Sequence, residues 1–218
     1  MMVVVGGHSR NIGKTAVAEG LIRALPEAAW TAVKITQFGH AVCVAAGKPC
    51  ECASAPQYPY VIAEETTPSS RDTGRFLAAG ARRAFWVRAA QGRLGEALPA
   101  LRGIFAAGPN TIVESNSLLE FLRPDLYLVV ADFAIPDFKP STLRHLDRAD
   151  ALVVIERKHA VPAWKEVPPE LWRSKLQFRV QPPRYVTAEL AAFVRTRLSG
   201  PAPGGESGAD GRTDRAAS

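Results

Sequence analysis

A glycine-rich segment near the N-terminus carries the residues best suited to binding phosphate. It reads Val5-Gly6-Gly7-His8-Ser9-Arg10-Asn11-Ile12-Gly13-Lys14-Thr15, with a valine strand before it and an alanine-rich helix after it. Glycines let a backbone approach an anion closely, and the N–H groups and dipole of a helix start favour negative charge there. Lys14 would add a full charge at the terminal phosphates, and the Thr15 hydroxyl would ligate Mg²⁺. The pattern predicts a phosphate-binding loop, in which we expect these residues to contact a nucleotide: Gly7, Asn11, Ile12, Gly13, Lys14, Thr15 and Ala16.

Two carboxylates stand where a magnesium-phosphate site needs one. Such a site uses an acid to hold Mg²⁺ or to orient the attacking water. Glu114 ends the apolar run 111–114 and is the first candidate, as a magnesium ligand beside Thr15. Asp132 follows the apolar run 126–131 and is the second, because the sequence does not reveal the order of the strands. With Lys14, these two acids form the predicted catalytic set, although a strand-end acid on the surface is the simpler alternative for each.

Lys34 and Asp72 are further candidates for the nucleotide site. Lys34 lies near the carboxyl end of the strand predicted over 30–35, where it would meet the phosphates or an anionic second substrate. Alternatively, its aliphatic stem lies along the strand and its ammonium group reaches water. Asp72 precedes the helix predicted over 73–81, so an N-cap is the alternative to a role in the site.

All three cysteines of the chain fall in one short stretch with a histidine: His40, Cys43, Cys50 and Cys52. Disulfides are rare in cytosolic proteins, so clustered thiols there favour a metal. Three thiolates and one imidazole suit tetrahedral Zn²⁺, and an iron–sulfur cluster is the competing choice. The spacing matches no standard motif, so redox thiols and ordinary free cysteines stay open as alternatives.

The charge of the chain favours anionic ligands. The formal net charge is +6, and six arginines lie between Arg71 and Arg93. They form either a solvated helix face or a surface that meets phosphate. Aromatic residues are not interleaved with them, so nucleic acid is not an expected partner. No apolar run is long enough for a membrane span, and the N-terminus does not resemble a signal peptide, so we expect a cytoplasmic protein.

Apolar strands alternate with amphipathic helices along the chain. This pattern predicts a three-layer α/β fold, with a mostly parallel sheet and helices on both faces. A chain of 218 residues can bury the core of one domain, which we place at 1–199, with an irregular insertion at 37–70 and a disordered tail at 200–218. The expected strands are 3–5, 30–35, 84–87, 111–114, 126–131 and 151–155, and the expected helices are 14–25, 73–81, 94–106, 116–122, 140–146 and 187–198.

Ligands of such sheets bind at the carboxyl ends of the strands. We therefore expect four segments to converge at one edge of the sheet: the loop 8–15 and the residues that follow Ile35, Val113 and Ala131.

Two resemblances to known families follow from these motifs. Five residues separate Gly7 from Gly13, where the standard loop has four, and this spacing resembles that of dethiobiotin synthetase. The first 90 or so residues resemble molybdopterin-guanine dinucleotide biosynthesis protein B. That likeness rests on Val33-Lys34 and on the segment Arg71-Asp72-Thr73-Gly74-Arg75 with Ala79-Gly80-Ala81. The chain departs from that family at Ile35, where the family has histidine, and at Ser115, where it has glycine.

Three functions are open, of which the resemblances imply the first two. The first is a nucleoside-triphosphate-binding accessory protein, a slow Mg²⁺-dependent GTPase or ATPase linked to molybdenum-cofactor maturation. The second is an ATP-dependent ligase of the dethiobiotin synthetase type, and the third is a metal-binding adaptor switched by nucleotide. The expected partners are a nucleoside triphosphate, ATP or GTP, and a protein of cofactor maturation, and a homodimer is left open.

Overall fold

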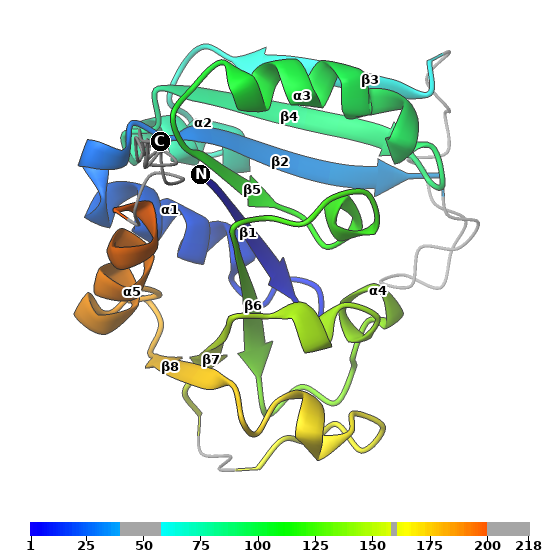
Figure 1. Cartoon of the computed structure of the whole chain (residues 1–218), viewed down its shortest axis with the longest axis vertical. Coiled ribbons are helices and arrows are strands. Elements are labelled where there is room, and N and C mark those ends of the chain that lie inside the picture. Colours follow the sequence, from blue (N-terminus) through cyan, green and yellow to red (C-terminus); the bar gives the residue numbers. More distant parts are fainter. Residues whose placement is uncertain (40–57, 158–160, 200–218) are drawn as a thin grey trace, which may run out of the picture.

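One eight-stranded sheet organises the chain (Figure 1). The computed structural model describes residues 1–39, 58–157 and 161–199. The strand order is β3-β4-β2-β5-β1-β6-β7-β8, and every neighbouring pair is parallel except β3 with β4. The strands are β1 (Met2–Gly7), β2 (Thr31–Phe38), β3 (Tyr60–Glu65), β4 (Arg83–Ala90), β5 (Thr111–Glu114), β6 (Leu126–Asp132), β7 (Ala151–Ile155) and β8 (Leu176–Val180).

Helices cover both faces of this sheet, which confirms the predicted three-layer α/β fold. The α-helices are α1 (Lys14–Ala24), α2 (Asp72–Ala78), α3 (Leu98–Ala106), α4 (Pro140–Leu143) and α5 (Ala188–Leu198). Strand residues alternate between the faces, so Val3 and Val5 pack on one core and Val4 on the other. The first core also holds apolar residues of α1, α2 and α5, and the second holds Leu101 of α3.

The central strands are β5, β1 and β6, and each is buried almost throughout. Such strands have helices on both faces and are apolar along their whole length, which is why the sequence predicted them well. The helix predicted over 14–25 also corresponds closely to α1. No helix among the residues that the structure describes is long and apolar enough to cross a membrane.

The structure differs from the expected elements mainly at the edges of the sheet. Strands β3 and β8 were not predicted, and β3 interrupts the stretch 37–70 that was expected to be irregular. Edge strands are half exposed, so their apolar pattern is weak. The helix expected over 116–122 is a 3₁₀ turn, Ser117–Glu120, and the one expected over 140–146 is the short α4 followed by a second 3₁₀ turn, Leu146–Arg148.

Candidate functional site

The loop between β1 and α1 has the tight winding that a phosphate loop needs. Gly13 has a φ of 93°, in the left-handed region that favours glycine, and Asn11 has a φ of 54°. A Cβ atom on Gly7 would lie 2.9 Å from both Ile12 Cδ1 and Lys14 Cγ. The stem of Lys14 therefore folds back over Gly7, and its Nζ atom donates to the Ser9 carbonyl at 3.4 Å.

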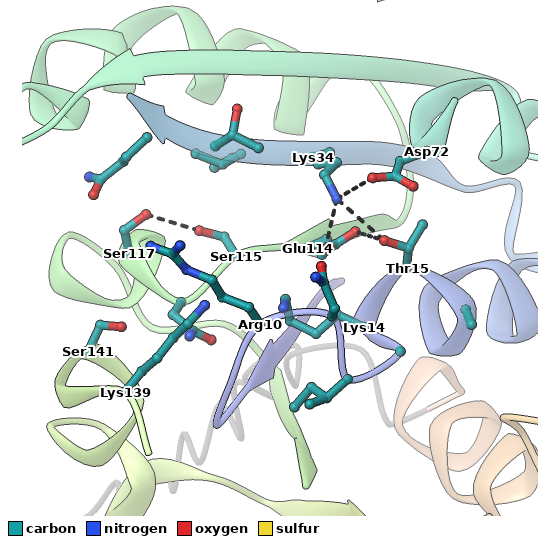
Figure 2. Close-up of a pocket in the computed structure, with 18 of the residues that line it drawn as sticks. Arg10, Lys14, Thr15, Lys34, Asp72, Glu114, Ser115, Ser117, Lys139 and Ser141 are labelled. Atoms are coloured by element: carbon teal, nitrogen blue, oxygen red, sulfur yellow. Dashed lines mark hydrogen bonds and ion pairs between the residues drawn. The ribbon is translucent and has the colours of Figure 1, made fainter. Parts of the chain in front are cut away.

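Four polar side chains from four different elements meet beside this loop (Figure 2). The Thr15 hydroxyl, at the start of α1, donates to Glu114 Oε2 at 2.7 Å. Lys34 on β2 places its Nζ 3.0 Å from Glu114 Oε1, 3.3 Å from Thr15 Oγ1 and 2.6 Å from Asp72 Oδ2. The structure thus brings together Thr15, Lys34, Asp72 and Glu114 as one cluster, named here the Thr15–Glu114 cluster.

Burial and charge act in opposite directions on the two lysines of the site. Burial lowers the pKa of Lys14, and the positive charge of Lys34 lowers it further, against the opposing effect of Glu114. Burial also disfavours the Lys34 ammonium group, but Glu114 and Asp72 outweigh it and raise the pKa of Lys34. Lys34 is therefore a firmly held cation, and Lys14 is a desolvated one whose charge an incoming anion would stabilise.

The Thr15–Glu114 cluster has the donor chemistry of a magnesium site. One hydroxyl and two carboxylates are hard oxygen ligands, which Mg²⁺ prefers. A cationic nitrogen already lies among these three oxygens, at 2.6 to 3.3 Å. Within the described ranges no group of three or more His, Cys, Asp or Glu side chains could hold a metal ion, so a magnesium ion here would need phosphate or water oxygens as well.

A cavity of about 790 Å³ opens over the loop and the cluster. The expected convergence is observed, since its lining comes from the carboxyl ends of β1, β2 and β5 and from the segment after β6. Of the residues that the sequence pointed to, it includes Asn11, Ile12, Gly13, Lys14, Thr15, Ala16, Lys34, Asp72 and Glu114. Gly7 contributes by leaving room for the Lys14 stem, as described above.

Asp132 does not line this cavity. Its side chain is 2% exposed, and its Oδ2 atom accepts from Arg157 Nε at 2.7 Å. Its Oδ1 atom accepts from the Ala134 N–H at 2.9 Å, so the carboxylate organises the turn after β6. The structure brings the carboxylate of Glu114, and not that of Asp132, into a hydrogen bond with Thr15 at the end of the phosphate loop.

Several residues that the sequence did not single out shape the site. Asn116 accepts from the Gly7 N–H through Oδ1 at 2.8 Å and donates to the Gly7 carbonyl through Nδ2 at 2.9 Å. Thr142 Oγ1 donates to the same carbonyl at 2.7 Å. These bonds fix the end of β1, where the loop begins. Asn116 is the second residue after β5, so the rule of carboxyl strand ends could have found it.

His8 joins the segment after β6 to the phosphate loop. Its Nε2 atom accepts from the Asp132 N–H at 3.0 Å, so the ring proton is on Nδ1, which donates to the Asp137 carbonyl at 2.8 Å. The His8 carbonyl also accepts from the Lys139 N–H at 2.7 Å. His8 is fully buried, and burial lowers its pKa, so the neutral ring is favoured. A lone histidine gave no sequence signal for this role.

The cysteine stretch His40, Cys43, Cys50 and Cys52 lies outside the described residues, so its metal remains a prediction from the sequence.

A Gly-Lys-Thr loop between the first strand and first helix of a largely parallel sheet defines the P-loop NTPase fold. No protein-family model and no curated protein matches the chain. Among solved structures, it is similar to the "apo" form of LpxK from Aquifex aeolicus, in complex with ATP. The identity is 17% and the TM-score 0.45, over 82% of this chain and 53% of that one, so the chain spans about half the length of that protein.

Proposed function

We propose that this protein binds a Mg²⁺-nucleoside triphosphate and transfers its terminal phosphoryl group. The observation that carries the proposal is the cluster in which Thr15 and Glu114 are joined at 2.7 Å, beside Lys14 and below one cavity. This combination of a loop lysine, a hydroxyl and a strand-end carboxylate is the set that phosphoryl transfer in P-loop proteins uses.

Each residue of the Thr15–Glu114 cluster has a role in this proposal, as does Lys14. The start of α1 and the loop N–H groups hold the phosphates, and Lys14 compensates their charge. Thr15 and Glu114 would hold Mg²⁺, which neutralises charge that develops on the phosphate oxygens during transfer. Asp72 would support that ion or a water bound to it. Lys34 holds the Glu114 side chain in place, because its ammonium group lies 3.0 Å from that carboxylate.

The nucleoside would extend from the phosphates toward Tyr185. A Cβ atom on Gly13 would collide with the Tyr185 ring, so this ring lies directly against the loop. Tyr185 and Ala16 line both the main cavity and a neighbouring one of about 610 Å³ along α1. An aromatic ring at the junction of two cavities suits a sugar or a base. Tyr185→Ala is expected to lower the affinity for a nucleoside triphosphate more than the affinity for inorganic triphosphate.

The choice between ATP and GTP, and between the three functions, rests on the sequence. The resemblance to molybdopterin-guanine dinucleotide biosynthesis protein B supports GTP and a role in molybdenum-cofactor maturation. The five-residue spacing of the loop supports ATP and a ligase of the dethiobiotin synthetase type. A nucleotide-switched metal-binding adaptor rests on the cysteine stretch. Nucleotide turnover distinguishes the three functions. The accessory NTPase should turn over with water alone, the ligase only with a second substrate, and the adaptor should bind nucleotide with little turnover.

Calorimetric titration with Mg²⁺ and non-hydrolysable analogues of ATP and GTP tests the proposal. Lys14→Ala is expected to weaken binding by at least 100-fold, because the loop loses its full charge at the phosphates. Lys165 is exposed and does not line the cavity, so Lys165→Ala is the matched control. Equal affinities of the wild type and folded Lys14→Ala would refute the phosphate-loop role.

A further inference from the structure

Two cations of the cavity have no role in the proposed nucleotide site. Arg10, in the phosphate loop, and Lys139, after β6, both line the cavity. Figure 2 shows them reaching into one part of it, on the other side of Lys14 from Thr15 and Asp72. Among the described residues, Lys34 is paired with Glu114 and Asp72, whereas no carboxylate forms an ion pair with Arg10 or Lys139.

The fold holds Lys139 in a place that disfavours its own charge. Burial lowers the pKa of Lys139 to about 8, and the positive charges of Lys14 and Arg10 contribute to this decrease. Asp137 and Glu114 oppose it only in part. The Lys139 N–H nevertheless donates to the His8 carbonyl at 2.7 Å, which holds the backbone of Lys139 against the loop. Concentrated, unpaired positive charge of this kind is stabilised by an anion.

Hydroxyl groups complete this part of the cavity. Ser117, in the turn after β5, and Ser141, in α4, line it beside the two cations. The Ser117 and Ser115 hydroxyls lie 3.3 Å apart, and Ser115 Oγ also accepts from the Leu118 N–H. A guanidinium group, an ammonium group and hydroxyls are the donors that bind phosphate and carboxylate oxygens.

The position of these donors distinguishes them from the nucleotide-binding groups. Lys14 and Thr15 lie at the start of α1, and Tyr185 lies against Gly13 there, so a nucleotide bound to them would extend along α1. Arg10, Lys139, Ser117 and Ser141 lie at the other end of the same 790 Å³ cavity, beyond Lys14. Cavities of this size hold ligands of drug size, so one cavity has room for two reactants.

We infer that Arg10, Lys139, Ser117 and Ser141 form a binding subsite for the oxyanion of a second, small-molecule substrate, a phosphate ester or a carboxylate. The inference rests on the proposed function, because the second substrate would face the terminal phosphate of the nucleotide. It favours an enzyme with two substrates over an adaptor.

Sulfate binding to the nucleotide-loaded protein tests this subsite. With Mg²⁺ and a saturating non-hydrolysable analogue filling the phosphate loop, sulfate titrated by calorimetry should bind to the wild type. Arg10→Gln and Lys139→Gln should each lower the affinity for sulfate at least tenfold. The affinity for the nucleotide analogue should fall by a much smaller factor. Arg102 is exposed and lies away from the cavity, so Arg102→Gln is the matched control. Acetate in a parallel titration separates a carboxylate subsite from a phosphate one.

The pH dependence of sulfate affinity is a second test of the role of Lys139. Sulfate keeps its charge between pH 7 and pH 10, so a change in its affinity reports the protein. Its affinity should fall as the pH rises above about 8 in the wild type, because Lys139 then loses its proton. The groups that face Lys139 are Lys14, Arg10, Asp137 and Glu114, and Lys139→Gln should flatten the decline while they stay in place.

Two outcomes would overturn the inference. One is that neither sulfate nor acetate binds to the loaded wild type. The other is that Arg10→Gln and Lys139→Gln lower the affinity for the nucleotide analogue as much as Lys14→Ala does. That result would assign both cations to binding of the triphosphate. If no analogue binds to the wild type, the proposed function fails instead, and sulfate binding to Lys14→Ala that an added Arg10→Gln abolishes would still support the subsite.

Discussion

Glu114 and Asp132 are two acids in equivalent places that do different things. Each ends a strand next to β1, and each is almost completely buried, with 6% and 2% of its surface exposed. Each also accepts from a cation, Lys34 or Arg157. Of the two carboxylates, that of Glu114 bonds to the phosphate loop, through the hydroxyl of Thr15, whereas Asp132 meets the loop through its backbone N–H, which donates to His8.

The register of the sheet explains this difference. Glu114 lies level with Val5, two residues before the end of β1. Val130 lies level with Gly7, the last residue of β1, and Asp132 is two residues farther on. At about 3.3 Å per residue, the two acids stand roughly 13 Å apart along the strand direction. The chain of β1 has turned into the loop before it reaches Asp132, so only Glu114 lies beside Thr15 and the start of α1.

The sharpest test of this comparison exchanges each carboxylate for its amide. Glu114→Gln should lower Mg²⁺-dependent phosphoryl transfer about 100-fold with much less effect on nucleotide binding, because the charge that faces Thr15 is lost. Asp132→Asn should change the rate less than threefold. Steady-state rates of phosphate release or product formation measure both. A normal rate for Glu114→Gln and an inactive Asp132→Asn would move the acidic role to β6.

Lys34 and Arg157, the cations paired with the two acids, should differ in how much each stabilises the fold. Lys34→Met leaves the buried Glu114 without its cation and should lower the free energy of unfolding by about 2 kcal/mol, less than a fully buried pair loses because Lys34 is partly exposed. Mg²⁺ should restore part of this loss, since the ion can replace the ammonium group among the same oxygens. Arg157→Met removes an exposed partner and should cost less, without rescue by Mg²⁺. Urea unfolding with and without Mg²⁺ measures these effects, and a rescue of Arg157→Met alone would contradict the comparison.

The smallest effect concerns His8, which connects the Asp132 side to the loop. Because burial lowers its pKa, the unfolded chain binds a proton more readily than the native one. Its contribution to stability is therefore complete above the unfolded pKa of about 6.5 and decreases as the pH falls below it. Between pH 7.5 and pH 5.5 the wild type should lose about 1 kcal/mol more than His8→Gln. Parallel urea curves at both pH values measure the difference, and identical losses would show that His8 has the same pKa in the native and unfolded states.

Much of the fold and the phosphate loop could be predicted from local pattern. The buried strands β5, β1 and β6 are continuous apolar runs, and α1 is a regular helix, so their positions were clear. The half-exposed edge strands β3 and β8 were missed, because their stability comes from pairing with distant neighbours. Lys14 and Thr15 were found because a glycine-rich loop between a strand and a helix is a local feature.

The sequence by itself determined the phosphate loop, the α/β class and the presence of an acid at the ends of β5 and β6. Only the tertiary structure decided that Glu114 meets Thr15 and Lys34 while Asp132 meets Arg157, and that Arg10 and Lys139 share one end of a cavity. The physical reason is that strand order and register are set by packing between segments as far apart as Val5 and Glu114. Residue type and spacing encode a local conformation, but which side chains face each other depends on how the whole sheet is assembled.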